Sequence, residues 1–508
     1  MKSYDNLIHL IQSLSRSEKI YFKKYTSRHV IGGMNNYTRL FDVLEKQKQY
    51  DETAIKKTFK GTTFIKHLPS EKNYLYHLIL KSLYGYNSEK SIDATLNELL
   101  LQVEILFEKN LFIQCGKLLQ QAKKIAYQHE KFYPLITIIK YQLAFSEKLS
   151  TEYKDVLFKE QDKALKNLEN EIQYSQLRRK IWYMHVKMER IRNAHELNRL
   201  KKLIVHPLLA NEKNAISFKA KCDFLTAHAI YTRTIGNNAK SYFFRKTLVE
   251  FIESSPEKIR TERAMYLRSL NYLMNILIIT KKYSEFLEVA KKTRSTFSVS
   301  ELEVISVFVT TYGSELAVYR DTGQFEKGIE LIREIEPLLE KYKRKLGTYN
   351  VFFFYNIISY LFFGAKQFHK ALWWVNKTLN NNDDITIESG EKMYITYARI
   401  INIIIHFELG NHDLLEHLLR SAYHFLDKEN VSNKVEMAVL HFMERVQKTN
   451  TSQELTKEFK RLKKEFISLQ KDPLEQPAFL YFDYVSWIES KIENKSFAEI
   501  ARGKAKRS

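Results

Sequence analysis

The sequence predicts an all-α fold in which helix pairs follow one another along the chain. Glycine (14) and proline (7) are scarce among the 508 residues, and both residues are typical of turn-rich and strand-rich folds. Apolar residues recur at helical spacing through most of the chain. A short segment pattern also returns at intervals of 41 to 45 residues. A nearly fixed repeat period is the signature of a solenoid.

Each repeated segment starts with a polar or glycine residue at an expected turn, which we call the anchor. An aromatic residue usually comes two positions later, as Phe368 does after Lys366, and a small residue such as Ala371 comes three positions after that. Thr151, Asn193 and Gly236 are chosen to fit the period, and the last two lack the aromatic residue. The eight anchors are Asn110, Thr151, Asn193, Gly236, Lys281, Gly323, Lys366 and Gly410.

This pattern resembles the second helix of a tetratricopeptide repeat, in which a turn glycine, an aromatic residue and an alanine occupy these positions. The resemblance implies a right-handed superhelix of about eight to nine helix pairs, each burying its apolar stripe against its neighbours. The period exceeds the family's roughly 34 residues, which indicates longer helices and leaves other helix-pair repeats open. The start of the chain also resembles an uncharacterised group of helical-repeat proteins of Bacteroidota, which implies no activity.

Four regions are expected along the chain. Residues 1–90 form an N-terminal helical cap, in which Ser15 and Glu18 have the spacing of a capping box. Residues 91–450 form the repeat array, and residues 451–495 form C-terminal capping helices. The basic tail, residues 496–508, is expected to be disordered.

Two apolar segments could belong to the core or have another role: the tryptophan pair could form a ligand site, and the uncharged stretch could span a membrane. Trp373 and Trp374 are adjacent, so they point about 100° apart on a helix, and we expect one to pack against a neighbouring repeat and the other to cover its flank. Residues 346–365 carry no charge over about the length that spans a bilayer. Polar residues such as Asn356 and Ser359 interrupt that stretch, which favours a buried helix over a membrane span.

Composition also bears on compartment and partners. The net charge of +22 favours contact with polyanions or acidic proteins. Cys115 and Cys222 lie in apolar helical patterns and are expected to be free, buried thiols of a reducing compartment. The N-terminus lacks the apolar core and cleavage site of a signal peptide. A cytoplasmic location is therefore expected.

No catalytic motif stands out in the sequence. It has no phosphate-binding glycine loop and no CxxC, HExxH or GxSxG segment. His412, Asp413 and His417 cluster just after an anchor, where polar surface residues are ordinary, so a metal site is not predicted there. We expect no enzyme activity, no cofactor and no bound metal.

The resemblance also implies where a partner binds, because the first helix of each tetratricopeptide repeat lines the concave face. Counting back from the anchors gives positions that are basic, amide-rich and tyrosine-containing. Asp223 and Asp321 are the exceptions among the positions in repeats three to seven. The predicted groove residues are Lys180, Tyr183, Lys187, Arg190, Arg233, Arg268, Asn271, Asn275, Arg320, Asn356 and Tyr360.

Three hypotheses for function follow. In the first, the chain is a non-catalytic scaffold whose basic groove holds an acidic or extended peptide segment of a partner protein. In the second, the same groove binds RNA or another single-stranded nucleic acid. In the third, the chain is an effector-sensing regulator whose N-terminal helices contact DNA. The identity of the partner and the oligomeric state are not encoded in any of these patterns.

Overall fold

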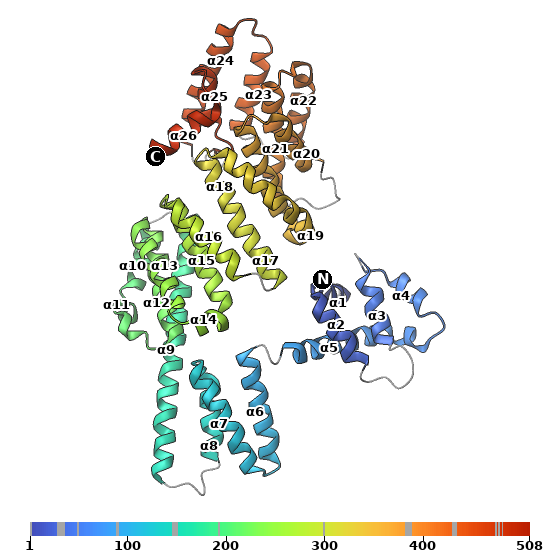
Figure 1. The fold of residues 1–508 in the computed structure, drawn as a ribbon, viewed down its shortest axis with the longest axis vertical. Coiled ribbons are helices and arrows are strands. Elements are labelled where there is room, and N and C mark those ends of the chain that lie inside the picture. The colour runs from blue at the N-terminus through green and yellow to red at the C-terminus, as the bar shows by residue number, and fades with distance from the viewer. Residues whose placement is uncertain are drawn as a thin grey trace. The chain divides into compact units, whose positions relative to one another are not determined.

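A computed structural model describes residues 3–507 apart from 28–35, 48–49, 88–90, 145–150, 191–193, 298–299, 381–388, 429–433, 473–474, 476–477 and 480. Within these residues the regular structure is entirely helical, as the sequence predicts (Figure 1). The chain divides into two compact units, Met1–Ser269 and Leu270–Ser508. The division falls inside the predicted repeat array.

The first unit begins with five helices that share a hydrophobic cluster of their own, around Ile11, Phe22, Phe41 and Leu75. The capping box is confirmed, since the amide of Ser15 donates to Glu18 Oε2 at 2.7 Å. The helices are α1 (Ser3–Ser13), α2 (Arg16–Ser27), α3 (Asn36–Glu45), α4 (Glu52–Thr58), the 3-10 turn η1 (Thr63–His67) and α5 (Leu68–Asn87).

The rest of the first unit packs largely in sequence-adjacent pairs, α6 with α7, α7 with α8, α8 with α9 and α12 with α13. The long helix α9 also packs against α12. The elements are α6 (Ile92–Glu108), α7 (Phe112–Gln128), α8 (Phe132–Ala144), α9 (Thr151–Arg190), α10 (Ala194–Ile204), α11 (Pro207–Ala210), η3 (Glu212–Asn214), α12 (Phe218–Thr234), α13 (Asn238–Glu253), α14 (Pro256–Thr261) and α15 (Arg263–Ile279), which crosses the division.

The second unit is again built from neighbouring helices in contact, for example α19 with α20 and α21 with α22. Its elements are α16 (Tyr283–Thr296), α17 (Glu301–Val307), the π-helical turn η4 (Phe308–Tyr312), α18 (Gly313–Asp321), α19 (Phe325–Gly364), α20 (Phe368–Leu379), α21 (Ser389–Glu408), α22 (His412–Lys428), α23 (Lys434–Val446), α24 (Ser452–Leu469), α25 (Tyr484–Ile492) and α26 (Phe497–Arg507).

Six of the eight anchors lie at helix-ending turns with positive φ. They are Asn110, Gly236, Lys281, Gly323, Lys366 and Gly410, with φ of 56°, 80°, 56°, 67°, 58° and 73°. Each turn is closed in the same way: at Lys366, for example, the next amide, that of Gln367, donates to the carbonyl of Phe362 at 2.9 Å. This is the Schellman end of an α-helix. Thr151 is instead the first residue of α9, and Asn193 lies outside the described residues.

Helix α9 departs from the regular alternation of helices and turns. It runs unbroken for 40 residues, through the second helix of one predicted repeat and the first helix of the next. A further turn with positive φ, at Glu130 (51°), joins α7 to α8 where no anchor is predicted. The period is therefore followed most closely from Gly236 onward.

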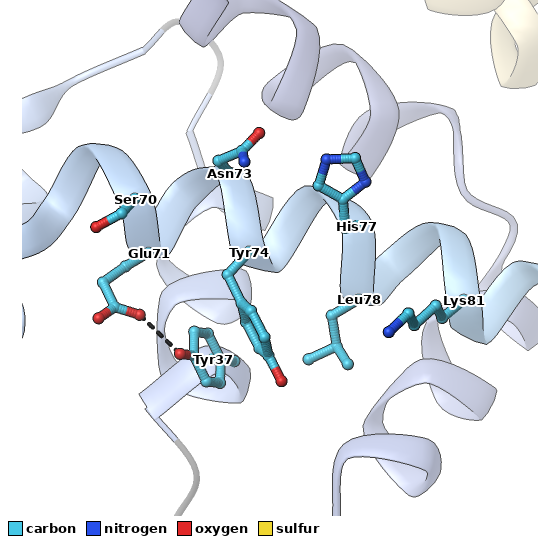
Figure 2. A pocket seen from close by; sticks show the side chains of 8 residues that line it. All are labelled: Tyr37, Ser70, Glu71, Asn73, Tyr74, His77, Leu78 and Lys81. Carbon is cyan, nitrogen blue, oxygen red and sulfur yellow. Dashed lines mark hydrogen bonds between the residues drawn. The ribbon is translucent and has the colours of Figure 1, made fainter.

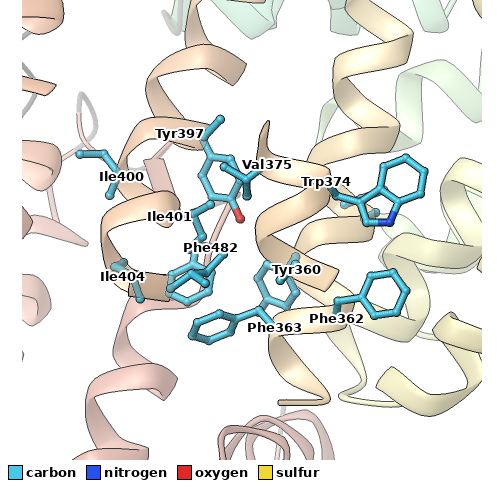
Figure 3. Packing of buried hydrophobic residues seen from close by; sticks show 14 of the residues in the cluster. Tyr360, Phe362, Phe363, Trp374, Val375, Tyr397, Ile400, Ile401, Ile404 and Phe482 are labelled. Atoms are coloured by element: carbon cyan, nitrogen blue, oxygen red, sulfur yellow. The ribbon is translucent and has the colours of Figure 1, made fainter. Parts of the chain in front are cut away.

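The two adjacent tryptophans take different environments, as their helical geometry predicts. Trp374 is buried and its ring centroid lies 5.4 Å from that of Tyr355. Trp373 is 49% exposed and covers the ammonium group of Lys377 at 3.9 Å from its ring centroid. Lys377 in turn pairs with Glu340 at 2.8 Å. Trp374 therefore packs in the core beneath α20, and Trp373 packs on the exposed side of that helix (Figure 3 shows Trp374).

Helix α19 contains the uncharged stretch. It is long and apolar enough to cross a membrane, but 72% of its most apolar window is buried inside the structure. The backbone of Gly347 (φ 73°, ψ 153°) breaks the helix, so the element is two helices joined at a kink. All residues of 351–364 except Phe353 are buried, which confirms the expected burial.

The prediction of a disordered tail was wrong. Residues 497–507 form α26, in which Phe497, Ala498, Ile500 and Ala501 are buried. A capping box begins the helix, since the Ser496 amide donates to Glu499 Oε2 at 2.8 Å and the Glu499 amide donates to Ser496 Oγ at 3.2 Å. The basic composition concealed this cap and a short apolar stripe.

Candidate partner-binding surface

The predicted groove residues of α9 share one exposed face of that helix. Lys180, Tyr183 and Lys187 follow one another at spacings of three and four, which places them side by side. Lys180 is exposed, Tyr183 is 68% exposed and Lys187 is half-buried. Arg190 ends the helix, but its side chain lies outside the described part of the structure.

The opposite face of α9 anchors these residues in the first unit. Tyr174, Ile181 and Met184 are buried there, and the Tyr174 hydroxyl donates to the carbonyl of Leu208 at 2.5 Å. Because the anchoring residues come from two turns on the same side of the helix, the exposed face has a fixed direction.

Polar contacts with α12 fix the position further. Arg178 pairs with Asp223 at 2.5 Å, and His185 Nδ1 lies 2.9 Å from the hydroxyl of Thr234. Burial raises the pKa of Asp223, and the neighbouring Arg178 opposes that rise. The pair uses one of the cations in the run Arg178 to Lys180 for structure and leaves Lys180 on the exposed face.

An additional aromatic and an additional cation extend this face. Arg179 is exposed and neighbours Tyr183 at a spacing of four, and Trp182, which is 39% exposed, neighbours Arg179 at a spacing of three. The sequence from Gln173 to Lys187 contains no Asp or Glu. We call Arg179, Lys180, Trp182, Tyr183 and Lys187 the α9 patch. Counting back from the anchors did not select Arg179 and Trp182 as groove residues. The stretch without carboxylates from Gln173 to Lys187 is a sequence signal that could have included them.

The predicted residues of α12 and α15 are placed less uniformly. Arg233, in the last turn of α12, donates to Asn238 Oδ1 at 3.1 Å. Arg268 and Asn275 on α15 are exposed. Asn271 is half-buried, and its Oδ1 is buried without a hydrogen-bond partner. Since α15 crosses the division between the units, its face is described by itself.

The three predicted groove residues farther along the second unit are buried or half-buried. Asn356 is 6% exposed and donates to the carbonyl of Phe352 at 2.8 Å. Tyr360 is 4% exposed and lies among aromatic rings (Figure 3). Arg320 pairs with Asp321 at 2.7 Å. Asn356 and Tyr360 therefore belong to the interior, whereas the Arg320 side chain is half-buried, with 22% of it exposed.

The cover over Tyr360 comes from the C-terminal part of the same unit. The ring of Phe482 lies 5.4 Å from that of Tyr360 and 5.1 Å from that of Phe363. Phe497 stacks on Phe482 at 5.8 Å. Burial raises the pKa of the Tyr360 hydroxyl well above its ordinary value, and the charge of Asp483 adds to the rise.

The return of α26 holds this cover in place. Arg502 Nε donates to the carbonyl of Gly323 at 2.9 Å, and its Nη2 donates to Glu326 at 2.8 Å. Gly323 also lies so close to α26 that an added Cβ would meet the Arg502 side chain at 2.9 Å. The predicted groove positions were counted from the anchors on the assumption that the face of each helix is exposed. That counting does not show that a segment from far along the chain, such as α26, covers a face.

Two other groups are relevant to chemistry. Among the described residues, no group of three or more His, Cys, Asp or Glu is arranged to hold a metal ion. Cys115 and Cys222 are free and buried, and burial raises the pKa of both thiols. A raised thiol pKa disfavours the reactive thiolate. The α9 patch is thus the predicted surface that the structure leaves most accessible.

In comparisons with known proteins, no protein-family model and no curated protein matches the chain.

Proposed function

We propose that the chain is a non-catalytic, tetratricopeptide-like scaffold of the cytoplasm, and that the α9 patch holds an acidic, extended segment of a partner protein. The observation that carries the proposal is the exposure of Tyr183 at 68%, between Lys180 and Lys187, on a helix whose other face is fixed. A rigid aromatic side chain beside cations is a favourable arrangement for anchoring a partner.

Charge favours an acidic ligand for this patch. The stretch from Gln173 to Lys187 contains two arginines and two lysines and no carboxylate. One arginine, Arg178, is neutralised by Asp223. Arg179 and Lys180 can pair with carboxylates of a bound segment, while Tyr183 can contact an apolar side chain between those carboxylates.

The second unit supports the idea that helix faces of this fold can receive another part of a polypeptide chain. There, residues Tyr481 and Phe482 lie against Tyr397 and Tyr360, with ring centroids 6.0 Å and 5.4 Å apart. Trp487 Nε1 then donates to Glu408 at 2.7 Å. The α9 patch offers aromatic and charged groups of the same kinds without such a cover among the described residues.

The test uses the full chain and a fluorescein-labelled peptide of alternating glutamate and tyrosine, followed by fluorescence anisotropy. The double variant Lys180→Glu and Lys187→Glu should weaken binding about tenfold or more, because two charge-assisted contacts become repulsions. Lys117 and Lys124 on α7 are exposed and have the same spacing of seven residues. Their double change to Glu is the matched control for net charge.

Equal loss in both double variants would show that the peptide responds only to overall charge, and the proposal would fail. A labelled single-stranded RNA in a parallel titration addresses the competing hypothesis. If the RNA binds the α9 patch more tightly than the peptide, with a steeper dependence on salt, the patch is a nucleic-acid site and not a peptide site.

A further inference from the structure

A second exposed ridge lies on α5 of the first unit, apart from the α9 patch. Its residues are Tyr74, His77, Lys81 and Tyr84, which follow one another at spacings of three, four and three. Residues at these spacings are neighbours on a helix surface. Tyr74 is 52% exposed, Tyr84 is 57% exposed, and His77 and Lys81 are exposed as well. We call these four residues the α5 ridge.

The ridge is set on a buried base. Leu75 and Ile79 on the other side of α5 are fully buried in the N-terminal cluster. Tyr74 is also braced from the side, because the ring of Tyr37 on α3 lies 4.6 Å from its ring. The exposed aromatic groups therefore belong to a packed helix and not to a loose surface segment.

A pocket of about 440 Å³ adjoins the ridge. Figure 2 shows the pocket-lining residues along α5, with Tyr37 of α3 beside Tyr74 and Lys81 further along the helix. Glu71 also lines the pocket, and its Oε2 accepts a hydrogen bond from the Tyr37 hydroxyl at 2.7 Å. The pocket thus combines two tyrosine rings, one leucine, one carboxylate and one ammonium group with the polar side chains of Ser70, Asn73 and His77.

The charge of this region suits a polyanion. Residues 1–90 contain sixteen Lys and Arg against eight Asp and Glu, a larger surplus for its length than the chain as a whole. In the part of the chain that the structure describes, Lys81 has neither an ion pair nor a hydrogen bond. Its ammonium group is therefore available to an anion from outside.

We infer that the α5 ridge binds single-stranded nucleic acid, with bases stacked on Tyr74 and Tyr84 and a phosphate on Lys81. Aromatic rings with a cation between them match the alternation of bases and phosphates in a single strand. From Tyr74 to Tyr84 the ridge is about 15 Å long at 1.5 Å per residue, which accommodates a short run of nucleotides. The carboxylate of Glu71 can accept a hydrogen bond from the amino group of a base in the pocket.

An acidic peptide is the competing ligand class, because it too would be attracted to Lys81. Stacking separates the two, since a base offers a flat aromatic face to Tyr84 whereas a glutamate side chain does not. The inference is also independent of the proposed function, because the α5 ridge and the α9 patch share no residue.

The experiment measures the anisotropy of a labelled twelve-nucleotide RNA of mixed sequence with the full chain at low salt. Tyr84→Ala should weaken binding about tenfold, since stacking on one aromatic ring contributes roughly 1–3 kcal/mol. Tyr133→Ala on α8 is the matched control, because that tyrosine is 72% exposed and should leave RNA binding unchanged. Both tyrosines are exposed, so neither change is expected to unfold the chain.

A second pair of variants tests the phosphate contact. Lys81→Glu should weaken RNA binding more than Lys117→Glu on α7, and should lower the slope of log affinity against log salt by about one. Lys180→Glu with Lys187→Glu should act on RNA no more than its α7 control, which distinguishes failure here from failure at the α9 patch.

Four results would overturn the inference. One is RNA affinity that is equal in Tyr84→Ala and Tyr133→Ala. Another is equal loss in Lys81→Glu and Lys117→Glu. The third is competition by a tyrosine-free peptide of glutamate and glycine as strong as competition by unlabelled RNA of the same length. A free nucleoside monophosphate serves as an additional competitor: if it displaces RNA at comparable concentration, the ridge binds mononucleotides and the single-strand assignment is wrong.

Discussion

The ring of Phe482, just before α25, lies 5.4 Å from the ring of Tyr360 in α19, at an interplanar angle of 66°. Edge-to-face pairs of this kind add to the stability that burial alone provides. Through this contact a segment from the C-terminal part covers a helix face that repeat geometry assigns to partner binding. The cover is the main reason why the predicted groove differs between the two units.

Truncation of Phe482 should destabilise the second unit. The side chain is 1% exposed and also contacts Phe363, so Phe482→Ala should cost about 3–5 kcal/mol in the free energy of unfolding. Urea denaturation followed by tryptophan fluorescence measures this cost. A loss below about 1 kcal/mol would mean that the aromatic cluster does not hold the segment in place.

Alanine substitutions at Trp373 and Trp374 should differ clearly in their effect on the free energy of unfolding. Trp374→Ala removes a buried ring and should cost about 3–5 kcal/mol. Trp373→Ala removes a half-exposed ring, with its cation–π contact to Lys377 and its edge contact to Trp374, and should cost less, about 1–2 kcal/mol. Urea unfolding of the two variants, compared with the wild type, measures both effects from the shifts in the unfolding midpoints. Similar effects of both changes would contradict the assignment of one ring to the core and the other to the flank.

The anchor turns give a prediction about backbone conformation. Gly410 has φ of +73° and nothing within 4 Å of an added Cβ, so Gly410→Ala should cost about 1–2 kcal/mol from backbone strain alone. Gly116 lies in a helix and also has open space around an added Cβ. Gly116→Ala should therefore stabilise the chain slightly, and thermal melts should move in opposite directions for the two variants.

Glu171 gives a prediction about pH. Burial raises the pKa of this carboxyl above its ordinary value of 4.5, and the hydrogen bond from Ser217 opposes the rise. The folded state therefore holds the proton more tightly than the unfolded state, and stability is lost as pH rises from about 4.5 through the raised pKa. Glu171→Gln avoids this loss, so its advantage over the wild type should grow with pH across that window.

Urea unfolding at several pH values measures this advantage. Glu169→Gln is a suitable control because Glu169 is exposed on the same helix, and its difference from the wild type should stay constant. If the stability difference between Glu171→Gln and the wild type also stays constant with pH, burial does not raise the pKa of the Glu171 carboxyl.

The sequence predicted the helical fold class and most turns because these depend on local features. Gly236 and Lys366 could be located from a period and a short pattern, and both adopt the left-handed conformation that ends a helix. The single helix α9 was not predicted. The repeat period places two helices between Thr151 and Asn193, and it carries no signal that these two helices are continuous. Tyr360 was assigned to an open groove because its contacts with Phe482 and Phe497, more than a hundred positions away, leave no local signal.

The most direct test of the central claim is photo-crosslinking in living cells from a benzophenone amino acid placed at position 183, with position 133 on α8 as the matched exposed control. The account predicts a crosslink from position 183 to one protein whose crosslinked peptide is acidic, and its loss when Lys180 and Lys187 are changed to Glu. Crosslinks that are the same from both positions, or only to nucleic acid from position 183, would contradict it.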